Sequence, residues 1–331
     1  MPFAARSILI PATVAAVAAA ALLSGARAAL TGAPSTGVVT RQATAPSPAL
    51  GRPIRYSLYK PAAEPAPGTR WPVLYLLHGG GPGEADWLDA GRVAETMDRA
   101  IAAGDIPPTV VVMPQAGDSW YVDNADSGGA GLMETALTRD LVRAIDASLP
   151  TAACRQGRAV AGLSTGGYGA LLYALDRPKR YGAAISLSGS ISGPIGPAMK
   201  DRVRRAARLY DGAFGKPFVP ARFNAMNLFP KAARLGIGEA PKPAFYLMAG
   251  DRDPGGIVQG TTELHLAFLR RKADSTLRIV AGRHEWALWR RELGPALKWL
   301  GPKLDATCGA AEPKEVAGAN PDLVGAPVAG R

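Results

Sequence analysis

The sequence predicts an α/β protein in which a mostly parallel central sheet carries helices on both faces. Three observations support this fold class. Short apolar runs alternate with helical patterns along most of the 331 residues. Most of these runs are continuous rather than alternating, as expected for strands that are covered on both sides. Apolar residues make up 47% of the chain, which is enough for a large core and excludes a disordered or collagen-like chain.

Seven apolar runs are expected to be the strands of this sheet, because each is short and most are rich in Val, Ile, Leu or Tyr. In chain order they are Ile54–Tyr59, Val73–Leu77, Thr109–Met113, Ala159–Leu163, Ala183–Leu187, Ala244–Ala249 and Leu277–Val280. Ligands of such sheets bind beyond the carboxyl ends of the strands, so the residues that directly follow these runs are the first candidates for function.

Four segments have the pattern of helices that cover the sheet. In Glu134–Leu149, apolar side chains recur every four residues, which places them on one face of a helix. The other three segments are Gly166–Leu175, Thr262–Lys272 and Trp286–Leu300. Together with the strands, these helices define one predicted domain over residues 53–304.

The first 28 residues are typical of an export signal. Arg6 supplies a positive charge, Ser7–Leu23 is an apolar run, and a small-x-small cleavage site ends at Ala28. The alternative is an uncleaved membrane anchor, but the run is at the short end for crossing a bilayer and a cleavage site follows it. We therefore expect a secreted or periplasmic protein that contacts a membrane only if the signal is retained.

Two further segments are expected to be flexible. Residues 29–52 form a lead-in to the domain and residues 305–331 form a tail, because both are rich in small residues and proline.

The only two cysteines of the chain, Cys154 and Cys308, exclude a disulfide framework and a cysteine-based zinc site. Cys154 precedes a predicted strand and Cys308 follows the last predicted helix, so both are expected at the edge where the strands begin. An oxidising compartment permits a disulfide between them. A disulfide and two free thiols both remain open at this point.

Ser164 is the candidate nucleophile. It is the centre of the motif Gly162-Leu163-Ser164-Thr165-Gly166, which lies between a predicted strand and a predicted helix. A sharp strand-to-helix turn exposes the serine hydroxyl, and the positions two residues before and after must be small to avoid the neighbouring backbone. An ordinary glycine-rich turn is the alternative, and the strand–turn–helix placement argues against it.

A serine nucleophile of this type needs a histidine base that follows it in the chain. Only two of the three histidines do so. His265 lies within a helical pattern, where a surface or packing role is usual. His284 follows the predicted strand that ends at Val280 and precedes the last helix, which places it at the carboxyl edge of the sheet. His284 is therefore the candidate base.

The carboxylate that orients the base is expected between the serine and the histidine. Asp251 and Asp253 both follow the strand Ala244–Ala249. We favour Asp253 because it lies further into the loop, and keep Asp251 as the alternative, since an aspartate here also caps turns or pairs with arginine.

The oxyanion of the transition state needs N–H donors. Gly80 lies in the glycine-rich segment that follows Val73–Leu77, and Thr165 directly follows the nucleophile, so their backbone amides are the candidates. His78 precedes the serine and is interpreted as a structural residue that holds this loop. A phosphate-binding role is disfavoured because no Lys-Ser/Thr pair follows the glycines.

Four separated segments, in the same order, resemble the putative esterase (esterase D-like) family of α/β-hydrolases. They are Leu76–Gly81, Gly162–Gly166 with its continuation to Ala170, Gly250 with Asp253, and Gly282–Trp286. The family includes S-formylglutathione hydrolases, tributyrin esterases, feruloyl and acetyl-xylan esterases and antigen 85-type mycolyltransferases. The resemblance covers roughly residues 50–302 and implies an α/β-hydrolase fold, a Ser164–Asp253–His284 triad, and Gly80 and Thr165 amides as oxyanion hole. No metal or cofactor is implied.

This chain departs from the family at Thr165, where relatives commonly have Met, although the backbone N–H survives that change. Trp120 and Tyr121 match an aromatic stretch that borders the site in relatives, so we expect them to bind substrate. Packing in the core is the equally weighted alternative for these two side chains.

Residues 190–243 contain ten Lys and Arg residues against three acidic ones, and so contribute most of the net charge of +11. They precede the acid loop, where α/β-hydrolases often place a lid. One interpretation is a solvated helical surface, and the other is a lid that favours anionic esters or an anionic envelope surface. No nucleic-acid-binding motif accompanies the charge, so nucleic acid is not expected as a partner.

These observations predict an exported serine carboxylic-ester hydrolase that acts through an acyl-enzyme on a small-molecule or carbohydrate ester. An acyltransferase to a sugar hydroxyl would use the same three residues, so it remains an alternative. A non-catalytic binding protein on the same fold is the other alternative, and the intact candidate triad argues against it.

Overall fold

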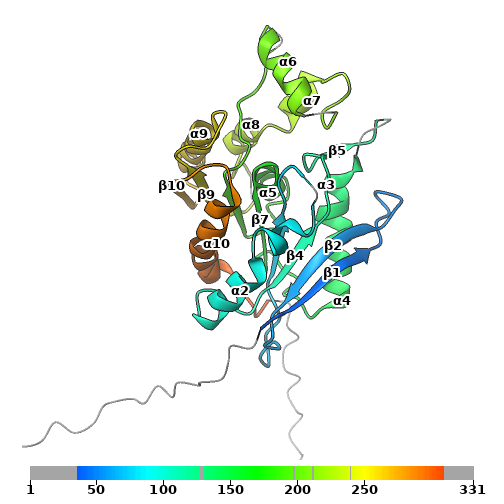
Figure 1. Ribbon diagram of the computed structural model, residues 1–331, viewed down its shortest axis with the longest axis vertical. Helices are drawn as coiled ribbons and strands as arrows, with labels where there is room; N and C mark the ends of the chain where they lie inside the picture. Colours follow the sequence, from blue (N-terminus) through cyan, green and yellow to red (C-terminus); the bar gives the residue numbers. More distant parts are fainter. Residues whose placement is uncertain are drawn as a thin grey trace, which may run out of the picture. The chain divides into compact units, whose positions relative to one another are not determined.

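The computed structural model of the protein describes residues 36–308, apart from residues 82, 127–129, 197, 211 and 239. The predicted export signal over residues 1–28, the start of the lead-in and most of the tail lie outside the described residues. The described part of the chain forms a central sheet that is flanked by helices (Figure 1).

The central sheet of the described residues has eight strands and is mostly parallel. In spatial order they are β1 (Val38–Ala45), β2 (Ile54–Lys60), β4 (Val110–Pro114), β3 (Val73–Leu77), β7 (Arg158–Leu163), β8 (Ala183–Leu187), β9 (Ala244–Gly250) and β10 (Ser275–Val280). β2 is antiparallel to both of its neighbours, and all pairs from β4 to β10 are parallel. All seven expected strands are present, and β3, β4, β7, β8 and nearly all of β9 are buried along their length, as their continuous apolar runs indicate.

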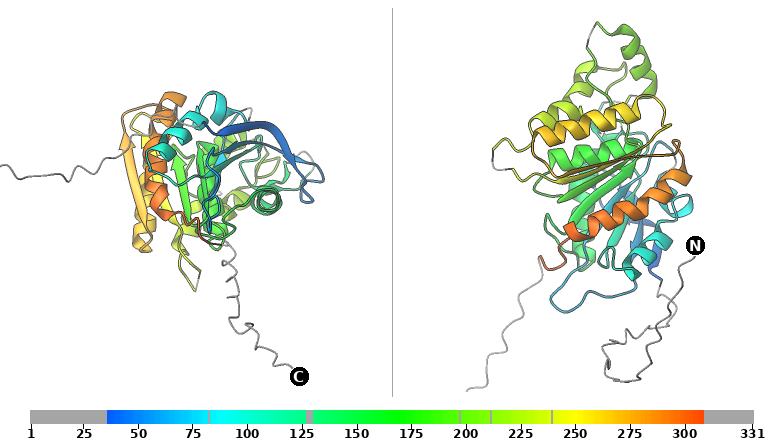
Figure 2. Two further views of the ribbon diagram at one scale, coloured as in Figure 1. Left: turned by 90° about the horizontal axis from the view of Figure 1, so that it is seen from below. Right: turned by 90° about the vertical axis from the view of Figure 1, so that its left-hand side faces the viewer.

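Helices cover the sheet on both faces and divide the core into two clusters (Figure 2). One face carries α5 (Thr165–Asp176), α9 (Ile257–Arg270) and the segment of α3 (Met133–Thr135), a π-helical turn (Ala136–Asp140) and α4 (Leu141–Ser148). The other face carries α2 (Val93–Ala102) and α10 (Trp286–Leu300). The four expected helices are therefore present, and α2 is an additional one. Shorter elements are α1 (Asp86–Asp89), a pair of two-residue strands, β5 (Asp123–Asn124) and β6 (Gly131–Leu132), and a 3-10 turn (Gly301–Lys303).

The described part of the lead-in is not flexible, which corrects our expectation for residues 36–52. β1 pairs with β2 in antiparallel register, from Val38 opposite Lys60 to Ala45 opposite Ile54, with an irregularity in the middle. This edge strand is largely exposed and has a mixed polar sequence, so it carries no continuous apolar run that would predict a strand.

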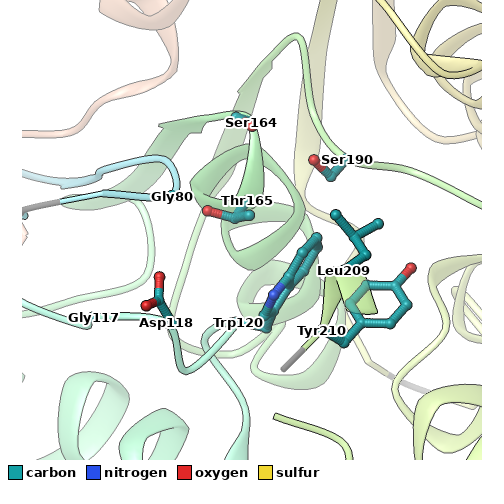
Figure 3. A pocket seen from close by; sticks show the side chains of 9 residues that line it. All are labelled: Gly80, Gly117, Asp118, Trp120, Ser164, Thr165, Ser190, Leu209 and Tyr210. Carbon is teal, nitrogen blue, oxygen red and sulfur yellow. The ribbon is translucent and has the colours of Figure 1, made fainter. Parts of the chain in front are cut away.

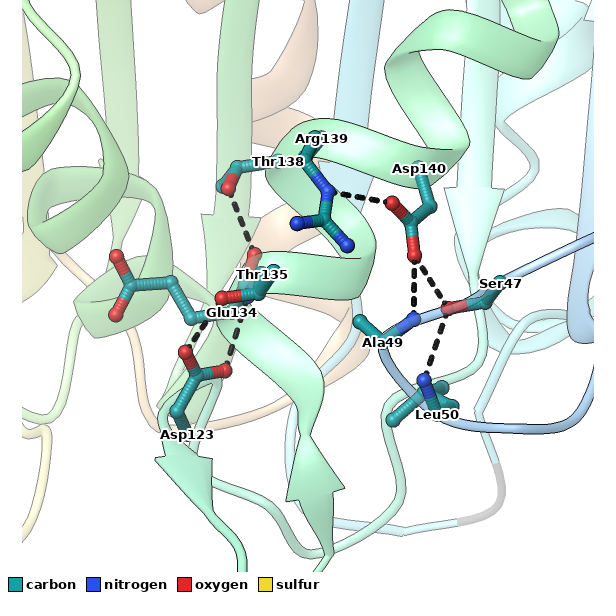
Figure 4. Close-up of polar contacts among 9 residues, drawn as sticks. All are labelled: Ser47, Ala49, Leu50, Asp123, Glu134, Thr135, Thr138, Arg139 and Asp140. Carbon is teal, nitrogen blue, oxygen red and sulfur yellow. Dashed lines mark hydrogen bonds and ion pairs between the residues drawn. The ribbon is translucent and has the colours of Figure 1, made fainter.

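Side-chain hydrogen bonds hold the turn that follows β1 against the helix (Figure 4). Asp140 accepts from the hydroxyl of Ser47 at 2.8 Å and from the backbone N–H of Ala49 at 2.9 Å. Arg139 donates to the other oxygen of the same carboxylate at 2.7 Å. Burial raises the pKa of Asp140, but these donors outweigh it, and the pKa lies below its ordinary value. A charged, multiply bonded carboxylate therefore fixes a segment that composition alone describes as flexible.

The insertion over residues 190–243 is helical. It contains α6 (Lys200–Leu209), α7 (Pro220–Ala225) and α8 (Leu228–Ala233). Tyr210, Phe214 and Phe223 pack together at its centre, with ring centroids 4.9 to 5.3 Å apart. Lys231 of α8 forms an ion pair with Asp176 at the end of α5, 2.7 Å apart, and so attaches the insertion to the sheet domain.

Cys154 and Cys308 form a disulfide, with their Cα atoms 6.1 Å apart. The sequence left a disulfide and two free thiols open, and the structure contains the disulfide. The first residues of the tail are also held at this edge, because the N–H of Asp305 donates to the carbonyl of Gln156 at 3.0 Å. Residues 305–308 are therefore attached to the domain rather than flexible.

Candidate active site

Ser164 lies on the sharp turn between β7 and α5, with φ 53° and ψ −118°. Its N–H donates to the carbonyl of Leu187 at 3.0 Å. A Cβ added to Gly162 would lie 2.3 Å from the carbonyl oxygen of Gly166, and one added to Gly166 would lie 2.4 Å from that of His78. Only glycine fits at both positions, which is the steric reason for the motif. The strained turn exposes the hydroxyl at the carboxyl edge of the sheet.

The structure brings the predicted base and acid together with Ser164. His284 lies in the loop between β10 and α10, and its Nε2 is 3.0 Å from the hydroxyl oxygen of Ser164. Its Nδ1 is 2.8 Å from a carboxylate oxygen of Asp253. The three side chains come from loops that are 31 and 120 residues apart in sequence, and they form one continuous chain of hydrogen bonds.

Asp253, rather than Asp251, contacts the histidine. Its side chain is fully buried, and its second oxygen accepts from the N–H of Gly250 at 2.7 Å. Burial raises the pKa of Asp253, but hydrogen bonds from His284, the hydroxyl of Ser188 and Gly250 lower it, and the net result lies below the ordinary value. Asp251 is half exposed and accepts from the N–H of Gly282 at 2.9 Å, so it fixes the turn before the histidine.

The two candidate oxyanion donors lie beside the nucleophile (Figure 3). Gly80, Ser164 and Thr165 line the same cavity. Within the described part of the chain, the N–H groups of Gly80 and Thr165 donate to no protein acceptor. They are therefore free to bind an oxyanion there.

His78 orients the peptide that carries the N–H of Gly80. Its Nε2 accepts from the N–H of Ala116 at 3.0 Å, so its proton is on Nδ1, which donates to the carbonyl of Gly79 at 2.6 Å. The carbonyl of Gly79 and the N–H of Gly80 belong to one trans peptide and point in opposite directions. Burial lowers the pKa of His78, which keeps the ring neutral in this role.

The cavity beside Ser164 and Thr165 has a volume of about 310 Å³. Trp120 and Tyr210 form its aromatic wall, with ring centroids 4.5 Å apart, and Leu209 at the end of α6 lies next to them (Figure 3). The insertion thus supplies part of the cavity. Asp118 also lines it and is exposed.

Tyr121 does not face this cavity, which corrects our expectation that it binds substrate. Its side chain is 1% exposed, and its hydroxyl donates to the carbonyl of His78 at 2.6 Å. This hydrogen bond holds the loop that carries His78 and Gly80, which we call the oxyanion loop. Adjacent aromatic residues in a loop point in different directions, so the sequence could not assign them separately.

A second cavity, of about 590 Å³, also reaches Ser164. Its lining includes His284, Trp286 and Trp289 of α10, and Asp86. The nucleophile therefore borders two cavities with different walls. His265, the other downstream histidine, lies on α9 and its Nδ1 is 2.9 Å from the hydroxyl of Ser275, outside this arrangement.

Four of the residues at this site that sequence reasoning missed matter for the argument below. Leu209 and Tyr210 line the first cavity, while Ser188 contacts Asp253 and Trp289 contacts His284. Ser188 directly follows β8 at the carboxyl edge, which is the signal that could have identified it.

Comparisons with known proteins identify the family and the fold. A family model described as "Putative esterase" matches residues 47–217. The endo-1,4-beta-xylanase/feruloyl esterase of Xylanibacter ruminicola is 38% identical over 121 residues, which are 36% of this chain and 17% of that protein. The acetyl esterase of Caldicellulosiruptor saccharolyticus is 25% identical over 232 residues, 69% of this chain and 82% of that protein.

A solved ferulic acid esterase superimposes with a TM-score of 0.66 at 23% identity, covering 81% of this chain and all of that one. The chain spans less than a fifth of the xylanase/feruloyl esterase, so that relative's activity does not transfer as a whole. The family model, in contrast, matches half of the chain. The protein therefore belongs to the putative esterase family and has the α/β-hydrolase fold.

Proposed function

We propose that this protein is an exported carboxylic-ester hydrolase with Ser164 as nucleophile. The observation that carries the proposal is the hydrogen-bond chain from Asp253 through His284 to Ser164, with distances of 2.8 and 3.0 Å, beside the free amides of Gly80 and Thr165. Nucleophile, base, orienting acid and oxyanion donors are the complete set that acyl transfer through serine requires.

In the proposed reaction, His284 takes the proton of the Ser164 hydroxyl as the serine oxygen attacks the ester carbonyl. The amides of Gly80 and Thr165 stabilise the oxyanion of the tetrahedral intermediate. His284 then protonates the departing alkoxide, and an acyl-enzyme remains. Water, deprotonated by the same imidazole, attacks this acyl-enzyme and releases the acid and free Ser164. Asp253 holds the imidazole and stabilises its charged form throughout.

The substrate is proposed to be a small-molecule or carbohydrate ester with a preference for anionic groups. Family relatives are named feruloyl and acetyl esterases, which supports an acyl group of modest size. The basic helix α6 ends at Leu209, which lines the first cavity. Arg205 lies one turn before Leu209 on the same face, and Arg208 is its neighbour, and both are exposed. They would attract an anionic ester to this cavity.

Export is supported by one structural feature besides the predicted signal. The Cys154–Cys308 disulfide is typical of proteins in oxidising compartments. Within residues 36–308, no helix combines the length and apolar character needed to cross a bilayer.

The proposal is tested by hydrolysis of p-nitrophenyl, feruloyl, acetyl-xylan and thioester substrates, with Ser164→Ala as the comparison. Purified wild-type protein is expected to hydrolyse at least one ester of the panel, and Ser164→Ala none. The same reactions with added sugar acceptors separate hydrolysis from acyl transfer, because a transferase forms the sugar ester instead of the free acid. Equal turnover by wild type and Ser164→Ala would contradict the proposal.

A further inference from the structure

Trp289 contacts His284 of the Ser164–His284–Asp253 chain directly, and it also contacts Ser188 beside that chain. Its ring stands edge-on to the imidazole of His284, with centroids 4.8 Å apart and planes at 90°. Its indole N–H donates to the hydroxyl of Ser188 at 3.1 Å. The hydroxyl of Ser188 in turn stabilises the charged carboxylate of Asp253 and so lowers its pKa. One indole is therefore connected to the imidazole through its ring and to the carboxylate through a hydroxyl.

The direction of this hydrogen-bond chain is fixed by the chemistry of its members. An indole N–H can only donate, and an ionised carboxylate can only accept. The hydroxyl of Ser188 must therefore accept from Trp289 and donate its single proton to Asp253. Without the indole, the hydroxyl could rotate and offer that proton elsewhere.

The surroundings hold both members in place. Ser188 is fully buried, has a φ of 50°, and its N–H donates to the carbonyl of Met248 at 2.7 Å. Trp289 is 6% exposed and packs edge-on against Trp286, whose ring packs in the same way against Trp87, with centroids 5.3 Å apart in each pair.

This row of rings ends at the oxyanion loop. The indole N–H of Trp87 donates to the carbonyl of Leu77 at 2.9 Å, at the end of the strand that leads to Gly80. The start of α10 is thus connected, through Trp87 of α1, to the end of the strand that precedes Gly80.

We propose that Trp289 and Ser188 are positioning residues of this active site. Trp289 orients the hydroxyl of Ser188, this hydroxyl holds the carboxylate of Asp253, and the ring of Trp289 fixes the plane of the His284 imidazole. The inference rests on the proposed function, because it requires Ser164, His284 and Asp253 to act as the catalytic residues.

The role of the hydroxyl is tested by Ser188→Ala and Ser188→Gly. Both remove the hydroxyl, and glycine adopts the positive φ of this position without strain, so an effect shared by the two variants is not caused by the backbone. With p-nitrophenyl acetate, we expect kcat to fall about tenfold or more in both, because a hydrogen bond to a charged group is lost, while KM stays within about twofold.

The pH profile provides a readout that a purely structural role would not move in this way. Asp253 loses one donor in the Ser188 variants, so its negative charge acts more strongly on the imidazole and favours imidazolium. The acid limb of the profile of kcat/KM is therefore expected to shift to higher pH.

The role of the indole is tested by Trp289→Phe, which retains an aromatic ring but no N–H. Because the N–H acts through Ser188, the loss of kcat in the double variant Ser188→Ala/Trp289→Phe is expected to be clearly smaller than the product of the two single losses. Trp299→Phe is the matched control: Trp299 is on the same helix, but packs against Tyr246 and Lys303. It is expected to retain wild-type kcat.

The outcomes separate the two proposals. Wild-type kcat in both Ser188 variants, an acid limb that does not move to higher pH, or independent effects of the two substitutions would overturn the positioning role. Circular dichroism and the melting temperature verify that each variant is folded, and a Ser188→Ala protein that fails to fold leaves the decision to Ser188→Gly and Trp289→Phe. Full activity of Ser164→Ala, in contrast, would mean that the proposed function itself is wrong.

Discussion

The two cavities at Ser164 have walls that are built in different ways. On one side, His284, Trp286 and Trp289 come from the start of α10 and the loop directly before it, and hydrogen bonds tie this α10 wall to Asp253 and Ser188. On the other side, Leu209 and Tyr210 come from the insertion; Leu209 is 62% exposed, and Tyr210 is held mainly by ring contacts. From this difference we propose a division of tasks, in which the α10 wall positions the reacting groups and the insertion wall selects the ester.

The largest effect is expected on the α10 wall. His284→Ala removes the base and should lower kcat/KM by about 10⁴- to 10⁶-fold, because serine alone is a poor nucleophile. Ester hydrolysis by the purified variants measures this loss. His265→Ala is the matched control, since His265 lies on α9, where it hydrogen-bonds to Ser275 of β10 rather than to Ser164, and it should retain activity. Similar losses of kcat/KM in both variants would contradict the assignment of His284 as the base.

The next effect separates the two aspartates behind this wall. Asp253→Asn should lower kcat by about 10³- to 10⁴-fold, because an amide cannot stabilise the imidazolium and favours the wrong tautomer. Asp251→Asn should cost far less, since Asp251 only fixes a turn through the N–H of Gly282. Steady-state kinetics of the two variants decide between them, and the reverse order would contradict the geometry described here.

A smaller effect concerns the loop between the two walls, which carries Gly80. Burial lowers the pKa of His78 below its ordinary value of 6.5. The unfolded chain therefore binds a proton at His78 near pH 6.5, where the folded protein does not. The free energy of unfolding consequently decreases as the pH falls below that value. The loss is at most about 1.4 kcal/mol per pH unit. Urea unfolding between pH 7.5 and 5.5 should show a steeper decline for wild type than for His78→Gln.

The smallest effect is expected on the insertion wall. Arg205→Gln combined with Arg208→Gln should raise KM for a uronate-bearing ester by about two- to fivefold at low salt, without a change in kcat, because exposed charges attract the substrate only weakly. The difference should disappear at high salt and should not occur for a neutral ester. Arg143→Gln on the distant helix α4 serves as control. If the double substitution leaves the KM of the uronate-bearing ester as unchanged as that of the neutral ester, the anionic preference is contradicted.

The nucleophile, the base and the orienting acid could be predicted from the sequence, because steric and topological rules leave few choices. Gly162 and Gly166 cannot carry a Cβ, and only two histidines follow Ser164. The carboxyl edge of a parallel sheet then collects the loops that carry Asp253 and His284.

Other features could not be predicted, since their pattern is shared with ordinary structure. Trp289 is an apolar residue three positions after Trp286, which is also the spacing of a core residue on a helix. Ser188 belongs to no motif. Tyr121 and Trp120 are adjacent aromatic residues in the sequence, and only their packing shows that they have different roles. β1 is a polar edge strand whose position depends on its pairing with β2 and on the hydrogen bonds of Asp140.

Covalent labelling tests the central claim most directly. A fluorophosphonate should react with the wild-type protein in a one-to-one ratio, and mass spectrometry of the digested protein should locate the phosphonyl group on Ser164. A label on any other residue, or undiminished labelling of Ser164→Ala, would show that Ser164 with His284 and Asp253 is not the site of acyl transfer.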